Sequence, residues 1–443
     1  MQVIFEKKIN EFNKFINVDP DKSISIRAFL ISSISEGVSK VSNILPSEDV
    51  FSTINSLKKL NCKIIKISKN EYKIFGKGLG SFYTTKKTLL DLGNSGTGLR
   101  LISSIISTTP NMEVNLTGDK SLKKRNMSKL INLLNEFGAE TYPKDKVYLP
   151  LKLKSSNFPV GIQFVAGSSA QLKSAAILAG LNSFGTTTIF EKSKTRDHTE
   201  NMLKKNSKSI LLKNKGNIIK IFGKKTLNSL NIKIPSDPSS AAFFAAICIL
   251  NKKSELKIRN VCTNPKRLGF YNILKKHGAK IKILNKKKQN NESVGDLFIK
   301  SGRIKPLKTS ASHYLTATDE YPIMFIIAAL TKGISKFRNI GGLVEKETNR
   351  ILEMKKILRK VGVKCTATKN SMTIFGSSNF IKTKKQITID SLHDHRLAMA
   401  SSVLALCTGA KIIIKGFETV NTSSPSFLKI VKKLGGKYEI KKK

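Results

Sequence analysis

The sequence contains no tryptophan and no long hydrophobic run. Its longest uninterrupted apolar stretch, residues 241–250, is far shorter than the roughly 20 residues that a membrane-spanning helix needs. Residues 1–10 carry charges without an apolar core behind them. We therefore expect neither an export signal nor a membrane-spanning segment.

Paired cysteines are absent as well. The five cysteines have spacings that fit neither a disulfide framework nor a zinc site: Cys62, Cys248, Cys262, Cys365 and Cys407. Free thiols are typical of a reducing compartment, so we expect a cytoplasmic protein. Asp390, His393, Asp394 and His395 lie close together, but their spacing is too irregular for a metal site. We therefore expect no metal and no cofactor.

Acidic residues are scarce. The chain has 79 Lys and Arg against 30 Asp and Glu, which gives a formal net charge of +49. Nucleic-acid binding is one explanation, because clustered basic residues neutralise phosphates. The lysines are spread along the whole chain, however, without a basic arm or interleaved aromatic residues. We expect no specific nucleic acid, and the positive field should instead attract small anionic substrates.

Arginine is rare in this lysine-rich chain, with eleven residues in total. Six of the eleven lie within or beside polar motifs: Arg27, Arg100, Arg125, Arg196, Arg350 and Arg396. A planar guanidinium can bind a carboxylate or a phosphate through two hydrogen bonds, which explains the use of Arg rather than Lys there. Anion binding is therefore the first hypothesis for these positions, with Arg100 left as structural.

One local pattern occurs six times. A small polar cluster precedes an apolar helix, and a β-branched strand follows. The clusters recur at intervals of roughly 70 residues, too long for a solenoid: residues 22–23, 94–97, 168–171, 237–240, 319–322 and 394–396. Because 443 residues are too many for one core, the pattern indicates two domains of three α/β units each.

The helices behind these clusters are apolar on nearly all sides, as at residues 175–179, 241–246 and 324–330. Such helices belong in the interior of a domain. Strands are expected around them at residues 40–43, 186–190, 256–260 and 411–415, with amphipathic helices at 127–137 and 350–361. If the buried helices of a domain are parallel, their positive N-terminal ends lie together. Two such ends facing each other would form an anion-binding cleft.

In their order along the chain, these motifs resemble enolpyruvylshikimate-phosphate synthase, from near residue 15 to near the C-terminus. The matching stretches are residues 21–27, 92–97, 116–119, 237–243, 319–322, 346–350 and 394–396. Three further stretches, residues 118–121, 169–173 and 196–200, are similar to the second, glyphosate-tolerant class of that family. The fourth marker of the class is partly met, because residues 264–267 read Asn-Pro-Lys-Arg instead of Asn-x-Thr-Arg.

The resemblance implies a two-domain inside-out α/β barrel, in which each domain has three βαβαββ units around buried parallel helices. One domain should comprise residues 22–235 and the other residues 1–21 and 236–443, with the active site in the cleft between them. The implied reaction transfers the enolpyruvyl group of phosphoenolpyruvate to the 5-hydroxyl of shikimate 3-phosphate. It releases phosphate from a tetrahedral adduct and serves chorismate and aromatic amino acid biosynthesis. The resemblance also implies a monomer.

The family's functional residues map onto three sets here. Shikimate 3-phosphate would be bound by Lys22, Ser23, Arg27, Ser169, Ala170, Gln171, Arg196, Asp319 and Lys346. Phosphoenolpyruvate would be bound by Lys22, Gly96, Arg125, Gln171, Arg350 and Arg396. The catalytic residues would be Lys22, Asp319, Lys346 and Glu347. Asp319 would accept the proton of the attacking hydroxyl, and Glu347 beside Lys346 would handle the proton at the methylene carbon. A plain helix cap is the alternative role for Asp319.

Some positions depart from the family pattern. Glu345 stands where an apolar residue is usual, Asn349 replaces Asp, and residues 424–427 are a looser version of a Phe-Pro-x-Phe stretch. Gly96 stands where some glyphosate-tolerant members of the family carry Ala. Tolerance of glyphosate therefore does not follow from the class motifs alone. The sister transferase that acts on UDP-N-acetylglucosamine uses a Cys on a mobile loop, and residues 110–124 contain none.

Overall fold

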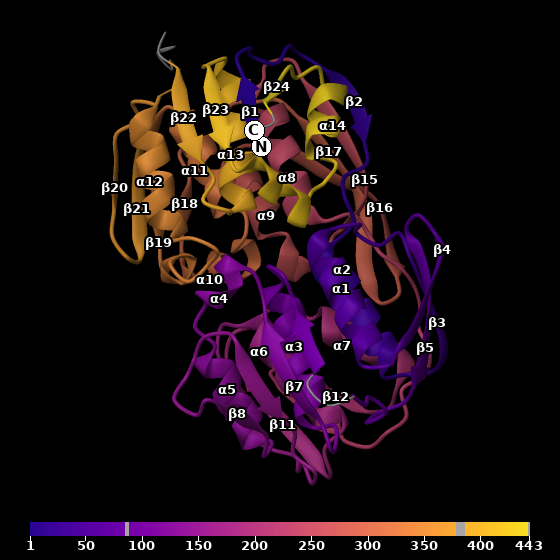
Figure 1. The fold of residues 1–443 in the computed structure, drawn as a ribbon. Helices are drawn as coiled ribbons and strands as arrows, with labels where there is room; N and C mark the ends of the chain where they lie inside the picture. The colour runs from indigo at the N-terminus through magenta and orange to yellow at the C-terminus, as the bar shows by residue number, and fades with distance from the viewer. Residues whose placement is uncertain (85–87, 378–385, 442–443) are drawn as a thin grey trace. The chain divides into compact units, whose positions relative to one another are not determined.

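The computed structural model describes residues 1–84, 88–377 and 386–441 (Figure 1). These residues form two compact units. Unit 1 comprises Met1–Asp19, Pro235–Lys287 and Ser293–Lys443, and unit 2 comprises Pro20–Ile234 and Lys288–Glu292. The boundaries expected from the sequence fell after residues 21 and 235, whereas the units change over after residues 19 and 234.

Unit 2 contains three long helices that are buried on nearly all sides, with shorter helices around them. The helices are α1 (Lys22–Ser33), α2 (Glu48–Lys59), α3 (Gly96–Ser107), α4 (Lys120–Lys123), α5 (Ser128–Glu136), α6 (Ala170–Leu181), α7 (His198–Asn206) and the 3-10 helix η1 (Asn214–Gly216). The strands are β3 (Glu36–Ser42), β4 (Lys63–Ser68), β5 (Glu71–Lys77), β6 (Thr88–Asp91), β7 (Glu113–Thr117), β8 (Glu140–Tyr142), β9 (Leu151–Lys154), β10 (Gln163–Ala166), β11 (Thr186–Glu191), β12 (Ile210–Lys213), β13 (Ile218–Phe222) and β14 (Asn231–Lys233).

Unit 1 repeats this composition. Its helices are α8 (Pro238–Leu250), α9 (Gly269–Lys276), α10 (Ala311–Ala317), α11 (Tyr321–Ala329), α12 (Arg350–Lys360), α13 (His395–Thr408), α14 (Phe427–Lys433) and the 3-10 helices η2 (Pro265–Arg267), η3 (Gly341–Leu343) and η4 (Phe417–Thr422). Its strands are β1 (Gln2–Phe5), β2 (Asn13–Ile16), β15 (Glu255–Cys262), β16 (Lys280–Gln289), β17 (Glu292–Lys300), β18 (Lys308–Thr309), β19 (Gly333–Arg338), β20 (Cys365–Ala367), β21 (Ser371–Gly376), β22 (Ile387–Asp390), β23 (Ile412–Lys415) and β24 (Glu439–Lys441).

Each unit has three four-stranded sheets of the same topology. The orders are β6-β7-β9-β8, β10-β11-β13-β12 and β14-β3-β5-β4 in unit 2, and β16-β17-β15-β2, β18-β19-β21-β20 and β22-β23-β1-β24 in unit 1. In every sheet one edge strand runs parallel to its neighbour, and that neighbour is antiparallel to the next strand. The sheets stay separate rather than closing into one barrel in the part of the chain that is described. The predicted α/β fold with three repeated units per domain is confirmed.

The buried helices explain why the sheets surround them. Every residue of α11 is buried, and in α8 every residue from Pro238 to Ile249 is buried. A helix that is apolar on all sides must be covered all round, so three sheets per unit enclose three helices. The helices α5 and α12 instead bury one side only, as expected from their amphipathic sequences.

The N-terminal residues complete unit 1. Strand β1 pairs antiparallel with β23 and with the C-terminal strand β24, and β2 pairs parallel with β15. Unit 2 is completed in the same way by β14, which pairs parallel with β3 although some 190 residues separate them in the chain. Both units are therefore closed by strands that lie far away in sequence.

Candidate active site

The six polar clusters of the sequence all lie at the starts of buried helices. In five of them a side-chain oxygen accepts a backbone N–H of the first turn: Asp21, Ser95, Ser169, Asp237 and Asp394. In the sixth, Glu320 takes the N-cap position of α11. Since the helix dipole places partial positive charge at these ends, each is suited to an anion once the flanking side chains allow it.

Hydrogen bonds join the starts of α1, α3 and α6 in unit 2. The Gln171 side chain donates from Nε2 to Thr97 Oγ1 over 2.8 Å, and its Oε1 accepts from Arg100 Nη1 over 2.9 Å. Arg27 on α1 donates from Nη2 to Ser174 Oγ of α6 over 3.1 Å. The three N-terminal ends therefore lie together, as the parallel arrangement predicted.

Lys22 is held by a residue that the sequence did not single out. Its Nζ lies 2.9 Å from Asp49 Oδ2, in the first turn of α2. Asp49 is buried, whereas the Lys22 side chain remains 19% exposed. The pair therefore orients the ammonium group of Lys22 while part of the Lys22 side chain stays exposed.

Gly96 lies against two arginines. A Cβ at this position would be 2.8 Å from Arg100 Nη1 and 2.8 Å from Arg125 Nη1. Arg125 donates to the amide oxygen of Asn94, and Asn94 in turn donates to Asp119 Oδ2 over 2.8 Å. The absence of a side chain at Gly96 thus leaves room for two guanidinium groups at the start of α3.

The other residues predicted to bind shikimate 3-phosphate also lie in unit 2. Arg27 is almost fully buried and donates to Ser23 O and to Thr199 Oγ1 as well as to Ser174, so it connects α1, α6 and α7. Ser169 caps α6, and Ala170 is the first residue of that helix. Arg196 is half-buried in the loop between β11 and α7. Ligand binding by these residues stays a prediction.

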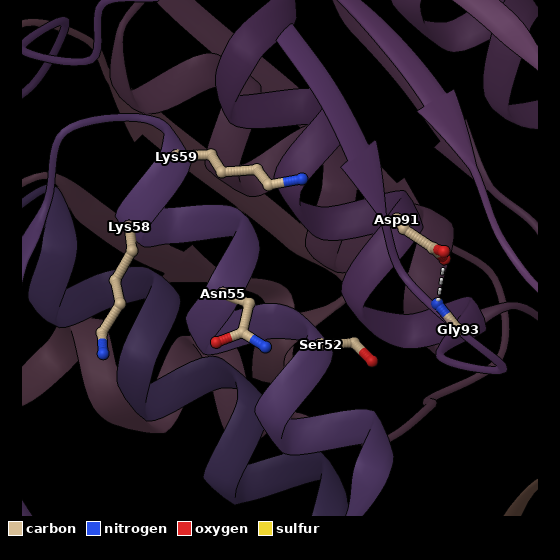
Figure 2. A pocket seen from close by; sticks show the side chains of 6 residues that line it. All are labelled: Ser52, Asn55, Lys58, Lys59, Asp91 and Gly93. Atoms are coloured by element: carbon tan, nitrogen blue, oxygen red, sulfur yellow. Dashed lines mark hydrogen bonds between the residues drawn. The ribbon is translucent and has the colours of Figure 1, made fainter.

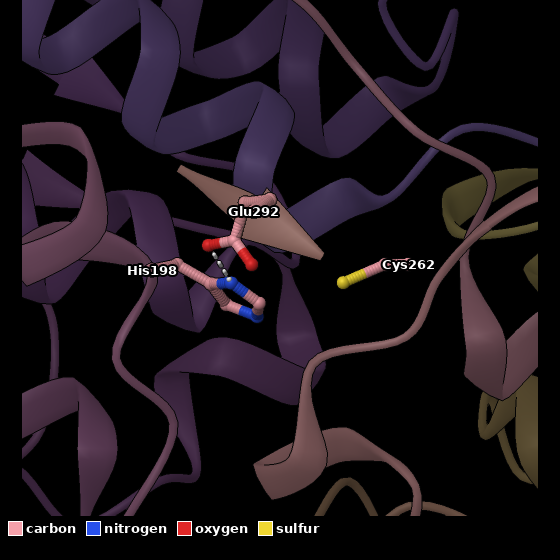
Figure 3. Close-up of side chains that lie close together, drawn as sticks. All are labelled: His198, Cys262 and Glu292. Atoms are coloured by element: carbon pink, nitrogen blue, oxygen red, sulfur yellow. Dashed lines mark hydrogen bonds and ion pairs between the residues drawn. The ribbon is translucent and has the colours of Figure 1, made fainter. Parts of the chain in front are cut away.

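His198, within the predicted motif at residues 196–200, makes a buried hydrogen bond. Its Nδ1 lies 2.8 Å from Glu292 Oε1 (Figure 3). The same Glu292 oxygen accepts from Asn201 Nδ2 over 3.1 Å. All three residues belong to unit 2, because residues 288–292 group with it. The contact attaches those residues to the first turn of α7.

A surface hollow of about 500 Å³ lies beside α2 in unit 2 (Figure 2). Its lining residues are Ser52, Asn55, Lys58, Lys59, Asp91 and Gly93. Lys59 Nζ donates to the backbone oxygen of Leu89 over 2.8 Å, and Asp91 Oδ1 accepts from Gly93 N. None of the residues predicted to bind substrate lines this hollow.

In unit 1, one arginine gathers three carboxylates. Arg350 donates from Nε to Asp394 Oδ2 over 2.8 Å and from Nη2 to Glu347 Oε2 over 2.6 Å. Its Nη1 lies 3.7 Å from Asp319 Oδ1. Burial alone would lower the pKa of Arg350, but the three carboxylates outweigh it and raise the pKa above its usual value. The predicted catalytic pair, Asp319 and Glu347, is thus brought to a single guanidinium.

Asp394 is the fixed point of this cluster. It is fully buried, caps α13 through Arg396 N, binds Arg350 with both oxygens and accepts from Thr348 Oγ1 over 3.0 Å. Asn349 caps α12 by accepting from Leu352 N over 3.1 Å. The substitution of Asn for the usual Asp therefore keeps the cap without adding a fourth carboxylate.

Arg396 differs from Arg350. It is only 6% exposed, and its Nε and Nη1 have no hydrogen-bond partner among the residues that are described. Its Cζ lies 6.0 Å from the centroid of the Phe243 ring. A buried guanidinium with unused donors is costly in isolation, so the geometry favours an anion from outside the chain.

The remaining departures from the family pattern are accommodated locally. Glu345 is exposed, and Lys346 beside it is half-buried. Ser424 Oγ and Ser426 N donate to the buried carboxylate of Asp19 over 2.9 and 3.1 Å, and Phe427 packs on Phe244. Burial raises the pKa of Asp19 despite these hydrogen bonds. The stretch 424–427 thus has a structural role in unit 1.

The family model for EPSP synthase (3-phosphoshikimate 1-carboxyvinyltransferase) matches residues 6–431 of this chain. The chain belongs to the EPSP synthase family. The resemblance inferred from the sequence motifs is confirmed, since the match extends over nearly the whole length.

Relatives and solved structures agree with this family. A 3-phosphoshikimate 1-carboxyvinyltransferase of Petrotoga mobilis is 36% identical over 424 residues, covering 95% of this chain and 97% of the relative. One of Paramagnetospirillum magneticum is 34% identical, with 95% and 94% covered. The structure of EPSP synthase from Acinetobacter baumannii matches with a TM-score of 0.87 at 32% identity, and each chain is fully covered. The enolpyruvyl transferase NikO from Streptomyces tendae shares the fold, with a TM-score of 0.72 at 12% identity over 99% and 98% of the two chains.

No helix in the described ranges is both long enough and apolar enough to cross a membrane. The five cysteines are buried, and none of them forms a disulfide among the described residues. Burial raises the pKa of Cys62 to about 11 and that of Cys248 to about 12, so these thiols stay protonated at neutral pH.

Sequence reasoning missed the residues that hold the site residues in place. Asp49 is an acid in the first turn of an amphipathic helix, which is a common position without functional meaning. Asn94 and Asp394 were part of quoted motifs but had no assigned role. Their partners lie 25 to 44 residues away, so only tertiary structure brings them together.

Proposed function

We propose that this protein transfers the enolpyruvyl group of phosphoenolpyruvate to the 5-hydroxyl of shikimate 3-phosphate and releases phosphate. The proposal is carried by two features of unit 1. The buried Nε and Nη1 of Arg396 have no hydrogen-bond partner in the described chain, and three carboxylates surround Arg350. An anion-binding arginine beside proton-transfer groups is what this reaction requires.

The chemistry assigns the proton-transfer steps to unit 1. The substrate hydroxyl attacks C2 of phosphoenolpyruvate while a proton reaches its methylene carbon, which gives a tetrahedral adduct. Asp319, with a side chain 20% exposed, accepts the hydroxyl proton, and Glu347 with Lys346 delivers the proton to carbon. Phosphate then leaves C2 while Glu347 takes a proton back from the methyl group, which forms the C=C bond of the enol ether product.

Binding of the substrates' phosphate and carboxylate groups is assigned mainly to residues of unit 2. Lys22, Gly96, Arg125 and Gln171 act on phosphoenolpyruvate, together with Arg350 and Arg396. Shikimate 3-phosphate is held by Lys22, Ser23, Arg27, Ser169, Ala170, Gln171 and Arg196, with Asp319 and Lys346. Support comes from the shared hydrogen bonds at the starts of α1, α3 and α6. Under this proposal, residues of both units act on the same pair of substrates.

The test is a phosphate-release assay with both substrates. We expect release only when shikimate 3-phosphate and phosphoenolpyruvate are present together. Asp319→Asn and Glu347→Gln should each lower kcat by about 10²-fold or more, because each removes a proton-transfer group without changing its shape. Glu353→Gln is the matched control, since Glu353 lies on α12 and pairs only with the exposed Lys356 in the described contacts. Salt-sensitive DNA binding without any turnover would contradict the proposal.

We also infer a cytoplasmic monomer. The five cysteines are buried without a disulfide among the described residues, which supports a reducing compartment. Sedimentation of the purified protein over a range of concentrations tests the monomer, and a mass that rises to twice 49.0 kDa would contradict it.

A further inference from the structure

Unit 2 contains a buried cation that binds no predicted ligand. Lys173 lies in the second turn of α6, and its Nζ is 2.7 Å from Glu200 Oε1 and 2.9 Å from Glu191 Oε1. The three side chains are 0, 3 and 2% exposed, respectively. Glu191 ends β11 and Glu200 lies in the first turn of α7, so the lysine joins three elements.

The charge of Lys173 is maintained in this buried position by its two glutamates. Burial by itself would lower the pKa of Lys173, but Glu200 and Glu191 outweigh it and raise the pKa. The lysine is therefore charged at neutral pH. Such buried ion pairs add little net stability compared with apolar packing, although breaking one leaves an unpaired buried charge.

The carboxylates fix the loop that carries Arg196. Glu191 Oε1 accepts from Thr195 N over 2.7 Å and from Thr195 Oγ1 over 2.6 Å. These bonds close residues 191–195 immediately before Arg196. Glu200 fixes the other side of Arg196, four residues further on. Lys173 thus holds the loop at both ends.

A second set of hydrogen bonds runs beside the first. Thr199 Oγ1 donates to Ser174 Oγ over 2.9 Å, and Arg27 Nε donates to Thr199 Oγ1 over 2.9 Å. Neighbouring residues of α6, Lys173 and Ser174, therefore bind neighbouring residues of α7, Glu200 and Thr199. Together they tie the start of α6 to the loop before α7 and to Arg27 of α1.

We propose that Lys173 is a positioning residue for shikimate 3-phosphate, which sets Arg196 relative to Ser169, Ala170 and Gln171. This inference rests on the proposed function, because it assumes that these four residues bind that substrate. A phosphate bound by a planar guanidinium and helix-end groups depends on their spacing. The coupling also gives a physical reason for the joint presence of residues 169–173 and 196–200 in this chain.

The decisive variant is Lys173→Met, which keeps the length and apolar stem of the side chain. We expect KM for shikimate 3-phosphate to rise by about tenfold or more, while kcat and KM for phosphoenolpyruvate change by less than about threefold. Asn182→Ala is the matched control. Asn182 is buried at the opposite end of α6, where it donates to Thr108 O and accepts from Lys224 Nζ. It should lower Tm without moving KM.

A double variant separates positioning from stability. Lys173→Met leaves two buried carboxylates without a cation, so Tm should fall. Adding Glu200→Gln removes one of these charges and should recover part of Tm. The link between α6 and α7 stays broken, however, so KM for shikimate 3-phosphate should remain raised. Recovery of KM together with Tm would overturn the proposal, because Lys173 would then act only on stability.

Glu200→Gln alone guards against misfolding of the methionine variant. It keeps the shape and leaves Lys173 paired with Glu191, so it should fold, and KM for shikimate 3-phosphate should rise by about threefold. If the wild type turns over and KM for shikimate 3-phosphate is unchanged in both Glu200→Gln and Lys173→Met, the positioning role is overturned. A wild type that releases no phosphate would overturn the proposed function as well, so the two failures are distinguishable.

Discussion

The two units use the same fold differently. In unit 2, Arg100 donates to Gly96 O and to Gln171 Oε1, and Arg125 donates to Asn94 Oδ1 and to Ser121 Oγ. In unit 1, Arg350 is surrounded by Asp319, Glu347 and Asp394. These hydrogen bonds in unit 2 thus reach neutral oxygens, whereas Arg350 in unit 1 is paired with carboxylates.

This difference shows how a repeated architecture supports two chemical tasks. Both units begin their central helices with capped polar clusters, so the backbone device is shared. Under the proposed function, the clusters of unit 2 mainly bind anions and those of unit 1 mainly transfer protons. Arg396 in unit 1 has two buried nitrogens, Nε and Nη1, without a hydrogen-bond partner among the described residues, whereas Arg350 has one, Nη1.

Removing the centre of the unit 1 cluster should have the largest effect. In Arg350→Met, three carboxylates lose their cation, one of them fully buried. We expect a loss of about 3–5 kcal/mol in the free energy of unfolding and a fall in kcat/KM of about 10³-fold. Urea denaturation and phosphate release measure the two effects. Arg359→Met, at an exposed position of the same helix, should change neither.

Arg396→Lys tests whether Arg396 binds phosphoenolpyruvate rather than stabilising the fold of unit 1. We expect KM for phosphoenolpyruvate to rise about 30-fold, corresponding to a charged hydrogen bond of about 2 kcal/mol. The Tm should stay close to that of the wild type, since the variant removes no hydrogen bond of Nε or Nη1 found in the described chain. A fall in Tm as large as that of Arg350→Met would show that the two arginines do not differ in role.

Gly96→Ala probes the cationic side of the comparison. The added Cβ would lie 2.8 Å from both Arg100 Nη1 and Arg125 Nη1, so these flexible side chains must move. We expect KM for phosphoenolpyruvate to rise by about tenfold with little loss of Tm. Gly302→Ala is the control, because its Cβ would meet no atom closer than 3.7 Å. Equal kinetics for the two variants would argue against a role of the Gly96 site in binding.

A smaller effect is expected for Asp49→Asn. The amide can still accept from Lys22, but the charge that orients the ammonium group is lost. We expect kcat/KM to fall by about fivefold, the equivalent of ~1 kcal/mol. Steady-state kinetics with both substrates measures this. A variant that lost as much activity as Arg350→Met would show that unit 2 depends on ion pairing as strongly as unit 1.

The smallest effect is predicted for Asp19, a buried carboxylate of unit 1 outside the Arg350 cluster. Burial raises its pKa in the folded state, so the folded protein binds more protons than the unfolded chain between the unfolded pKa of 3.8 and the raised value. Stability therefore falls as pH rises through that window. Asp19→Asn should raise the free energy of unfolding at pH 7 by up to ~1 kcal/mol and leave it unchanged near pH 3. Lower stability at pH 7 would contradict this reasoning.

The sequence predicted the elements better than their partners. Strands expected at residues 186–190 and 411–415 are β11 and β23, within one residue at each end, because β-branched runs mark them clearly. The strand expected at residues 40–43 begins four residues earlier, at Glu36, because Glu36 and Gly37 look like a turn in sequence. The pairing of β14 with β3 had no local signal, since it joins strands from opposite ends of unit 2.

The site followed the same rule. Motif residues such as Arg350, Gln171 and Asp319 were identifiable because they stand in stretches that resemble the family's motifs. Their immediate surroundings were not, because Asp49, Asp394 and Glu191 act through contacts that only the folded chain creates. Lys173 illustrates the limit: within a largely apolar helix it gives no sign of the two glutamates that bind it.

The most direct test of the account is phosphorus NMR of a reaction containing the protein, shikimate 3-phosphate and phosphoenolpyruvate. The account predicts that inorganic phosphate appears in a one-to-one ratio with a new phosphate ester, while both substrate signals disappear together. Phosphate that appears with either substrate alone, or no change over hours with active protein and both substrates present, would contradict it.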